Sequence, residues 1–203
     1  MTDQTLPDVS RETNERLQIY AELLRKWNSK INLVSRASLD DLWARHIVDS
    51  AQIAQIAPER VEYWADLGSG GGFPGIVAAI LLQETRPAAQ VTLVESDQRK
   101  CAFLRTVLRE TECAGTVIAE RIEKLPPLSA DVLSARALAD LSSLLGYADH
   151  HLSPDGVALF PKGTTWKEEV KEAQSKWHFD LEVATSLTDP AAAILKISGV
   201  SRV

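Results

Sequence analysis

Strand-like and helix-like segments alternate along most of the chain, and this alternation constrains the fold more than any other feature. Strands are predicted over residues 61–67, 90–97, 115–121, 130–137 and 156–163, and helices over 74–84, 98–110, 140–152 and 165–177. Short apolar strands separated by helices are typical of a mostly parallel sheet with helices on both faces. Two last segments, 181–187 and 192–198, predict a final antiparallel pair. The expected class is therefore α/β, a Rossmann-like doubly wound sheet with an antiparallel strand at its end.

Two amphipathic segments precede this alternating region. Residues 10–29 carry apolar side chains at helical spacing, which predicts a helix. A second helix is expected to begin at Ser38, with an acid three residues later as in a capping box, and to end before Pro58. The aromatic side chains of both helices lie on apolar stripes and are expected in the core. We therefore expect a helical extension, residues 1–58, packed on one compact α/β domain, residues 59–203.

A loop with five glycines follows the first predicted strand, in the sequence WADLGSGGGFPG over residues 64–75. A phosphate-binding P-loop would continue with Lys and Ser or Thr, and apolar residues stand there instead. The glycines of a dinucleotide fingerprint, G-x-G-x-x-G, are present at Gly70, Gly72 and Gly75. Pro74, however, removes an N–H group that would bind a pyrophosphate, and the carboxylate of Asp66 would repel one. Both phosphate-binding interpretations are therefore disfavoured.

A third spacing, G-x-G-x-G, is present directly after Asp66, at Gly68, Gly70 and Gly72. It suits a ligand that carries an ammonium group and no phosphate, and S-adenosylmethionine (SAM) is such a ligand. In doubly wound folds an acidic residue at the end of the second strand binds the ribose hydroxyls. Glu95 ends the segment VTLVE at that place. Strand, glycine loop, helix, strand and acid together predict SAM binding.

Seven segments, spread over nearly the whole chain, resemble one known family. They are KWNSKINLVS (26–35), RHIVDS (45–50), DLGSGGGFPG (66–75), VESDQRKCAFL (94–104), AERIEKL (119–125), SARALADL (134–141) and FPKG (160–163). The family is bacterial ribosomal RNA small-subunit methyltransferase G, also called glucose-inhibited division protein B. Other members often have proline and leucine where this glycine loop has its fourth and sixth residues. The resemblance implies a class I SAM-dependent methyltransferase fold and N7 methylation of one guanine of 16S ribosomal RNA near the decoding site.

The resemblance also implies roles for individual residues. By motif position, Gly68 and Phe73 contact SAM, Glu95 binds the ribose, and Ile122 and Glu123 lie beside the adenine. The whole cofactor-binding set expected is Asp66, Gly68, Gly70, Gly72, Phe73, Glu95, Ile122, Glu123 and Arg136. The residues expected to contact the RNA substrate are Lys162, Lys100 and His46.

Arg136 is expected to face the methyl-transfer site and to be the catalytic residue. Guanine N7 has a lone pair and no proton, so methylation there needs no general base. The segment SARALAD lacks the Asn/Asp-Pro-Pro-aromatic motif of exocyclic-amine methyltransferases. Arg136 would donate to O6 or to a phosphate, since arginine commonly grips guanine through O6 and N7 and N7 must stay free. The alternatives are a surface arginine paired with an acid such as Asp140, and a structural His46 paired with Asp49.

Composition limits the function less than the motifs do. The net charge is −6, and Cys101 and Cys113 lack metal-ligand spacing. We expect a cytoplasmic, monomeric protein with reduced thiols, no metal and no membrane partner, whose partner is 16S RNA in the small ribosomal subunit. Three other classes remain open. They are a SAM-dependent methyltransferase acting on a small molecule or protein, a nicotinamide oxidoreductase, and a non-catalytic module that binds RNA or the ribosome.

Overall fold

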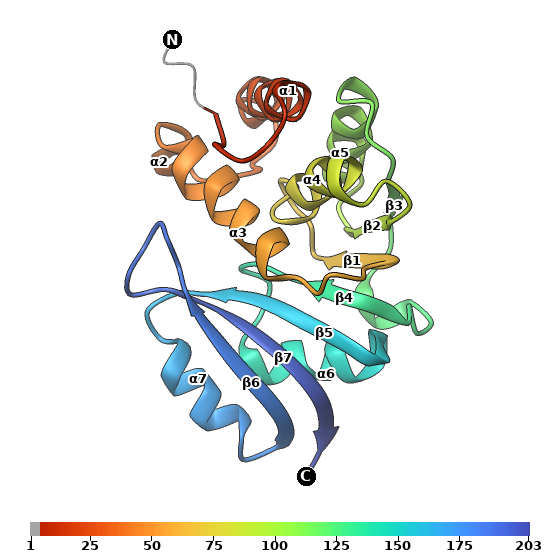
Figure 1. Ribbon diagram of the computed structural model, residues 1–203, viewed down its shortest axis with the longest axis vertical. Coiled ribbons are helices and arrows are strands. Elements are labelled where there is room, and N and C mark those ends of the chain that lie inside the picture. Colours follow the sequence, from red (N-terminus) through yellow and green to blue (C-terminus); the bar gives the residue numbers. More distant parts are fainter. Residues whose placement is uncertain (1–4) are drawn as a thin grey trace.

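A single seven-stranded sheet organises the computed structural model, which describes residues 5–203 (Figure 1). The strand order is β3-β2-β1-β4-β5-β7-β6. The strands are β1 (Tyr63–Leu67), β2 (Gln90–Val94), β3 (Thr116–Ile118), β4 (Ala130–Ser134), β5 (Leu152–Lys162), β6 (Trp177–Thr185) and β7 (Ala193–Arg202). The first five are parallel, and β7 lies antiparallel between β5 and β6. The predicted fold class and the antiparallel final pair are confirmed.

Helices cover both faces of this sheet. They are α1 (Arg11–Asn28), α2 (Arg36–Leu39), η1 (Trp43–Val48), α3 (Asp49–Ile56), α4 (Gly75–Thr85), α5 (Gln98–Glu110), η2 (Ile122–Lys124), α6 (Leu141–His151) and α7 (Trp166–Ala173). One face carries α4 and α5, with α1 and α3 packed outside them, and the other face carries α6 and α7 (Figure 1). None of these helices, within residues 5–203, is long and apolar enough to cross a bilayer.

The hydrophobic core divides between the two faces because side chains alternate along each strand. Trp64, Leu93 and Val132 pack into the cluster under α1, α3, α4 and α5. Ala65 and Leu133 pack into the cluster under α6 and α7. Helix α4 is apolar almost all round, and it is buried because α1 and α3 cover its outer side. The leading helices thus share one core with the sheet.

The second predicted helix is wrong in its boundaries. The segment divides into α2, the π-helical turn η1 and α3, and α2 begins after Ser35, whose side chain accepts from the N–H of Ser38. Ser38 is therefore inside the helix and buried. The π turn and the start of α3 place His46 and Asp49 so that both reach Arg136. Such turns are often found at functional sites.

Candidate functional site

The glycine loop joins β1 to α4 at the carboxyl edge of the parallel strands. Gly68, Gly70 and Gly72 have φ angles of 63°, 55° and 94°, which glycine adopts without strain. A Cβ atom on Gly68 would lie 2.6 Å from the side chain of Leu138. One on Gly75 would lie 2.5 Å from Oδ2 of Asp66. The loop therefore requires glycine both for its backbone conformation and for its close approach to neighbouring side chains.

Glu95 fixes this loop from the end of β2. Its carboxylate accepts hydrogen bonds from the backbone N–H of Gly70, at 2.9 Å, and of Asp97, at 2.8 Å. The side chain is largely buried. The acid predicted at the end of the second strand therefore lies beside the glycine loop and positions it.

Asp66 lies beneath the loop rather than on its open side. The residue is fully buried, and its Oδ1 accepts a hydrogen bond of 2.6 Å from the hydroxyl of Ser134. Its Oδ2 has no hydrogen-bond partner among the described residues. Burial raises the pKa of this carboxyl group to about 6. Asp66 does not line the cavities on either side of the loop, and in this structure it supports the turn.

A cavity of about 410 Å³ opens beside the glycine loop, and we call it the cofactor cavity. Five predicted cofactor residues line it, namely Gly68, Gly70, Glu95, Ile122 and Glu123. Lys100 also lines this cavity, although the sequence assigned it to the RNA. The sequence analysis missed the other lining residues, among them Ala137, Leu138 and Tyr147 from the segments after β4. These lining residues fit SAM, since carboxylates can accept hydrogen bonds from ribose hydroxyls and apolar side chains can cover an adenine.

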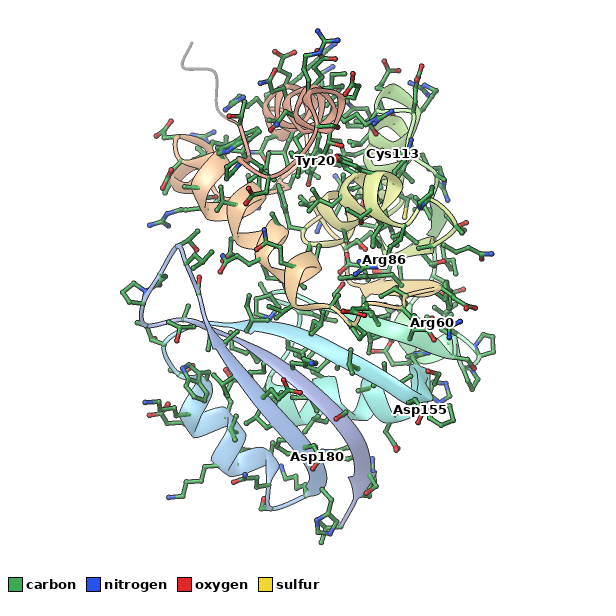
Figure 2. All side chains as sticks on the ribbon, in the orientation of Figure 1. Tyr20, Arg60, Arg86, Cys113, Asp155 and Asp180 are labelled. Carbon is green, nitrogen blue, oxygen red and sulfur yellow. The ribbon has the colours of Figure 1, made fainter. Side chains whose placement is uncertain are left out.

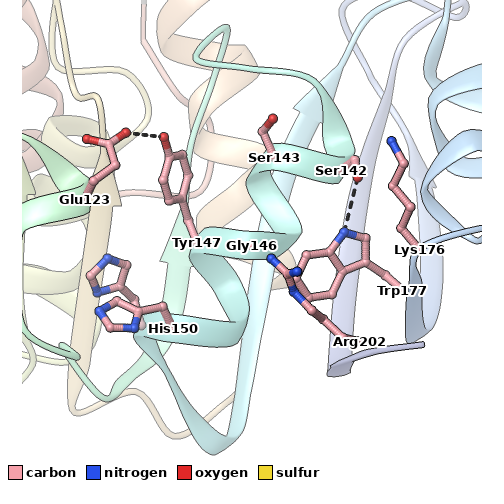
Figure 3. Close-up of a pocket in the computed structure, with 10 residues that line it drawn as sticks. Glu123, Ser142, Ser143, Gly146, Tyr147, His150, Lys176, Trp177 and Arg202 are labelled. Atoms are coloured by element: carbon pink, nitrogen blue, oxygen red, sulfur yellow. Dashed lines mark hydrogen bonds between the residues drawn. The ribbon is translucent and has the colours of Figure 1, made fainter.

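The carboxylate of Glu123 is held at one end of the cofactor cavity. It accepts a hydrogen bond of 2.5 Å from the hydroxyl of Tyr147, and this bond raises the pKa of Tyr147 to about 12. Figure 3 shows the Tyr147 ring pointing from α6 toward Glu123. Both side chains also line a groove along α6, of about 610 Å³, whose other end is formed by Trp177 and Arg202. The Glu123–Tyr147 pair thus separates the cofactor cavity from this groove.

Arg136 lies on the other side of the glycine loop, in a cluster with residues of η1 and α3. Its guanidinium is 3.3 Å from Oδ2 of Asp49 and 2.8 Å from Nδ1 of His46. It also lies over the ring of Phe73, at 4.9 Å from the centroid. Asp140, the acid offered as its alternative partner, instead caps α6 by accepting from the N–H of Ser143. The sequence considered Asp49 only as a partner of His46, so it missed the ion pair with Arg136.

His46 is neutral in this cluster. A guanidinium can only donate, so Nδ1 of His46 accepts from Arg136 and the ring proton is on Nε2. Burial, and then the charges of Arg136 and Arg45, lower the pKa of His46 to about 4. Its ring stacks on Phe73 at 4.8 Å between centroids. Phe73, predicted to contact SAM, thus packs against the arginine cluster and does not line the cofactor cavity.

A second cavity, of about 600 Å³, opens beside Arg136, and we call it the substrate cleft. His46, Asp49 and Arg136 form one wall, and the loop between β6 and β7 forms another. Ala137 lines both this cleft and the cofactor cavity. Both cavities therefore border the loop that follows β4, at the residue directly after Arg136.

Lys162 lines the substrate cleft, but its ammonium group is bound within the protein. Its Nζ lies 2.6 Å from Oε2 of Glu169 and donates to the carbonyl of Ala139 at 2.9 Å. Only 9% of the side chain is exposed. In this structure Lys162 fixes the loop between β4 and α6 against α7, a role that the motif FPKG did not indicate.

Comparison with known proteins gives consistent results at the level of sequence. The family model described as "rRNA small subunit methyltransferase G" (GidB) matches residues 13–194. A relative named "Ribosomal RNA small subunit methyltransferase G" from Ruegeria pomeroyi is 57% identical and covers 99% of this chain and 98% of its own. A relative of the same name from Paracoccus denitrificans is 53% identical, over 95% of this chain and 97% of its own.

Solved structures resemble the fold at much lower identity. A SAM-dependent methyltransferase from Aquifex aeolicus has a TM-score of 0.61 at 9% identity and covers 87% of this chain and 97% of its own. TYW2 from M. jannaschii, solved in complex with AdoMet, has a TM-score of 0.56 at 15% identity, over 86% of this chain and 80% of its own. Both similarities support the class I fold.

Proposed function

The chain belongs to the rRNA small subunit methyltransferase G family, and we propose that it transfers the methyl group of SAM to N7 of one guanine of 16S ribosomal RNA. The observation that carries this proposal is that the cofactor cavity and the substrate cleft both border the same loop, at Ala137. Two ligands bound in these cavities would meet beside Arg136. A bimolecular methyl transfer requires such a meeting of two sites.

The cofactor cavity is where we propose that SAM binds. SAM supplies a methyl carbon activated by a sulfonium, so the protein need not create the electrophile. The carboxylate of Glu95 would accept from the ribose hydroxyls, and Ile122 and Leu138 would cover the adenine. Gly68 and Gly70, which have no side chains, let the ligand lie against the backbone of the loop.

The substrate cleft is where we propose that the guanine binds. Its N7 carries a lone pair and no proton, so the protein has to orient the base and need not deprotonate it. The cluster around Arg136 fits that requirement, because its polar groups already form hydrogen bonds with one another. His46 Nδ1 accepts from Arg136, and the carboxylate of Asp49 accepts from Arg136 and Thr188. Arg136 would hold O6 of the base or a neighbouring phosphate with the donor capacity that remains. Orientation of this kind contributes several kcal/mol, up to ~7–11 in favourable cases.

The RNA substrate follows from the family, and we propose that it is presented in the small ribosomal subunit rather than as a small molecule or a protein. The test is transfer of tritium from labelled SAM to small subunits purified from cells that lack the gene, followed by mapping of the modified nucleotide. Naked 16S RNA and a mixture of cellular proteins and metabolites serve as the other acceptors. Label on one guanine supports the proposal, and label on protein or metabolites alone refutes it.

Arg136→Ala tests the role of the arginine within the same assay. We expect transfer to fall at least about a hundredfold while SAM still binds, since the guanidinium does not line the cofactor cavity. The matched control is Arg60→Ala, at an arginine that is 93% exposed and lies before β1, at the opposite edge of the sheet. Equal rates in the two variants would contradict the assignment.

A further inference from the structure

Helix α1 reaches the glycine loop through the hydroxyl of Tyr20. This hydroxyl donates a hydrogen bond of 2.5 Å to the backbone carbonyl of Gly71. Tyr20 is one of the completely buried residues of α1, and Figure 2 labels its position. Burial raises the pKa of its hydroxyl well above the usual value, so the group keeps its proton and remains a donor. A residue 51 positions earlier in the chain thus holds the middle of the loop.

The contact is close enough to fix the shape of the loop. A Cβ atom on Gly72 would lie 2.7 Å from the hydroxyl oxygen of Tyr20, and one on Gly71 would lie 3.1 Å from the carbonyl oxygen of Leu33. The ring of Tyr20 also packs against Phe73, at 5.2 Å between centroids. The segment that contains α1 and the turn after it therefore covers the outer side of the loop.

Two hydrogen bonds hold the loop at successive glycines. Glu95 accepts from the N–H of Gly70, and Tyr20 donates to the carbonyl of Gly71. Three consecutive glycines have more backbone freedom than any other tripeptide, and ordering them costs conformational entropy. A loop that is ordered before the ligand arrives avoids that cost at binding.

We propose that Tyr20 is a positioning residue that preorganises the glycine loop for SAM, so that α1 is part of the cofactor site. The inference rests on the proposed function, because it assumes that SAM binds beside this loop. Tyr20 acts through Gly71 and through Phe73, and the ring of Phe73 in turn lies under the guanidinium of Arg136.

The test is Tyr20→Phe, which keeps the ring and leaves the carbonyl of Gly71 without its partner. We expect the Kd for SAM, measured by titration calorimetry, to rise about tenfold. The KM for SAM should rise equally, while the KM for the RNA and kcat at saturating SAM stay within about twofold. The control is Tyr63→Phe, which removes a hydrogen bond of 3.1 Å between Tyr63 and Thr92. Tyr63 begins β1, at the end of that strand away from the loop.

A purely structural role predicts a different result. It would lower the melting temperature of both variants and leave both Kd values for SAM within twofold of the original, and that result overturns the inference. Replacing Tyr20 with 4-aminophenylalanine, which restores a donor, should recover the affinity, and a failure to recover it also counts against the inference. Both Kd values are measured below the lower of the two melting temperatures. If the unchanged protein binds no SAM, the proposed function itself fails, which is a distinguishable outcome.

Discussion

The carboxylate of Asp49 joins three segments of the site, and its loss tests how the site holds Arg136. Oδ2 lies 3.3 Å from the guanidinium of Arg136. Oδ1 accepts from the hydroxyls of Thr188, at 3.0 Å, and Ser186, at 3.3 Å. Asp49→Asn keeps the size of the side chain and an acceptor oxygen for the loop between β6 and β7. It removes the charge that opposes the guanidinium.

The expected loss of stability follows from the burial of the ion pair. The side chains of Arg136 and Asp49 are only 17% and 18% exposed. Exposed pairs contribute about 0–1 kcal/mol, and breaking a fully buried pair costs about 3–5 kcal/mol. A pair at this depth should cost about 2 kcal/mol when the charge of Asp49 is removed, which for a chain of this length lowers Tm by about 4–8 °C.

Activity should fall more than stability accounts for. With its carboxylate partner gone, Arg136 keeps His46, the carbonyl of Arg45 and the ring of Phe73 as neighbours. We expect kcat for transfer to fall about tenfold to a hundredfold, since small misplacements of a positioning group have effects of that size. The Kd for SAM should not change, because Asp49 does not line the cofactor cavity. Thermal unfolding, calorimetry and single-turnover transfer measure the three quantities.

The matched control is Asp41→Asn, in the turn between α2 and η1. Oδ2 of Asp41 lies 3.7 Å from Nε of Arg45, and both side chains are more than half exposed. Its removal should change the unfolding free energy by less than about 0.5 kcal/mol and leave transfer intact. Equal Tm values for the two variants, or an Asp49→Asn enzyme that transfers at the original rate, would refute the idea that this carboxylate positions Arg136.

Two further predictions concern the loop and the effect of pH. Gly68→Ala should weaken SAM binding at least about tenfold in calorimetry, because the left-handed backbone and the contact with Leu138 both oppose a Cβ atom. Gly163→Ala, whose Cβ would meet nothing within 4 Å, should bind SAM normally. Asp66 has a raised pKa, about 6, so the stability that its protonated form contributes is lost as pH rises from about 4 to 6. His46 has a lowered pKa, about 4, so the stability that its neutral form contributes is lost as pH falls from about 6.5 to 4. The two contributions change with pH in opposite directions. In Asp66→Asn the contribution of His46 is no longer offset, so the unfolding free energy from urea titrations should rise by about 3 kcal/mol between pH 4 and 6.5. A flat profile would contradict the lowered pKa of His46.

The sequence predicted the elements whose signals are local. Helix α5 occupies Gln98–Glu110 as predicted, because Asp97 caps it and its apolar residues keep one spacing throughout. β2 and β4, by contrast, end three residues earlier than predicted. The residues that follow these two strands turn away from the sheet and line cavities, and their apolar or polar character does not reveal this. The break at η1 was also missed, because the apolar spacing of this segment does not show where an α-helix gives way to a π-helical turn.

The site could be predicted only where the fold itself places residues together. Glu95 and Arg136 follow parallel strands, whose carboxyl ends meet at one edge, and both lie beside the glycine loop. The ammonium group of Lys162 pairs with Glu169 in the first turn of α7. No spacing in the sequence indicates that an ammonium group at the end of a strand has a partner within the protein. Charge alone therefore overestimates the cations that a substrate would meet.

Guanine N7 carries no proton to remove, so no group of this site has to act as a base. The charged groups of the site can therefore form hydrogen bonds and ion pairs with one another. A base that must accept a proton needs a free lone pair and a pKa near the working pH, and neither His46 nor Asp49 keeps its acceptor free of Arg136. Methylation at N7 asks instead for a rigid arrangement, and rigidity increases when each polar group has a fixed partner. Several of those partners lie before the sheet, since Tyr20, His46 and Asp49 all precede β1. Residues 5–58 thus help to hold the glycine loop and Arg136 in place.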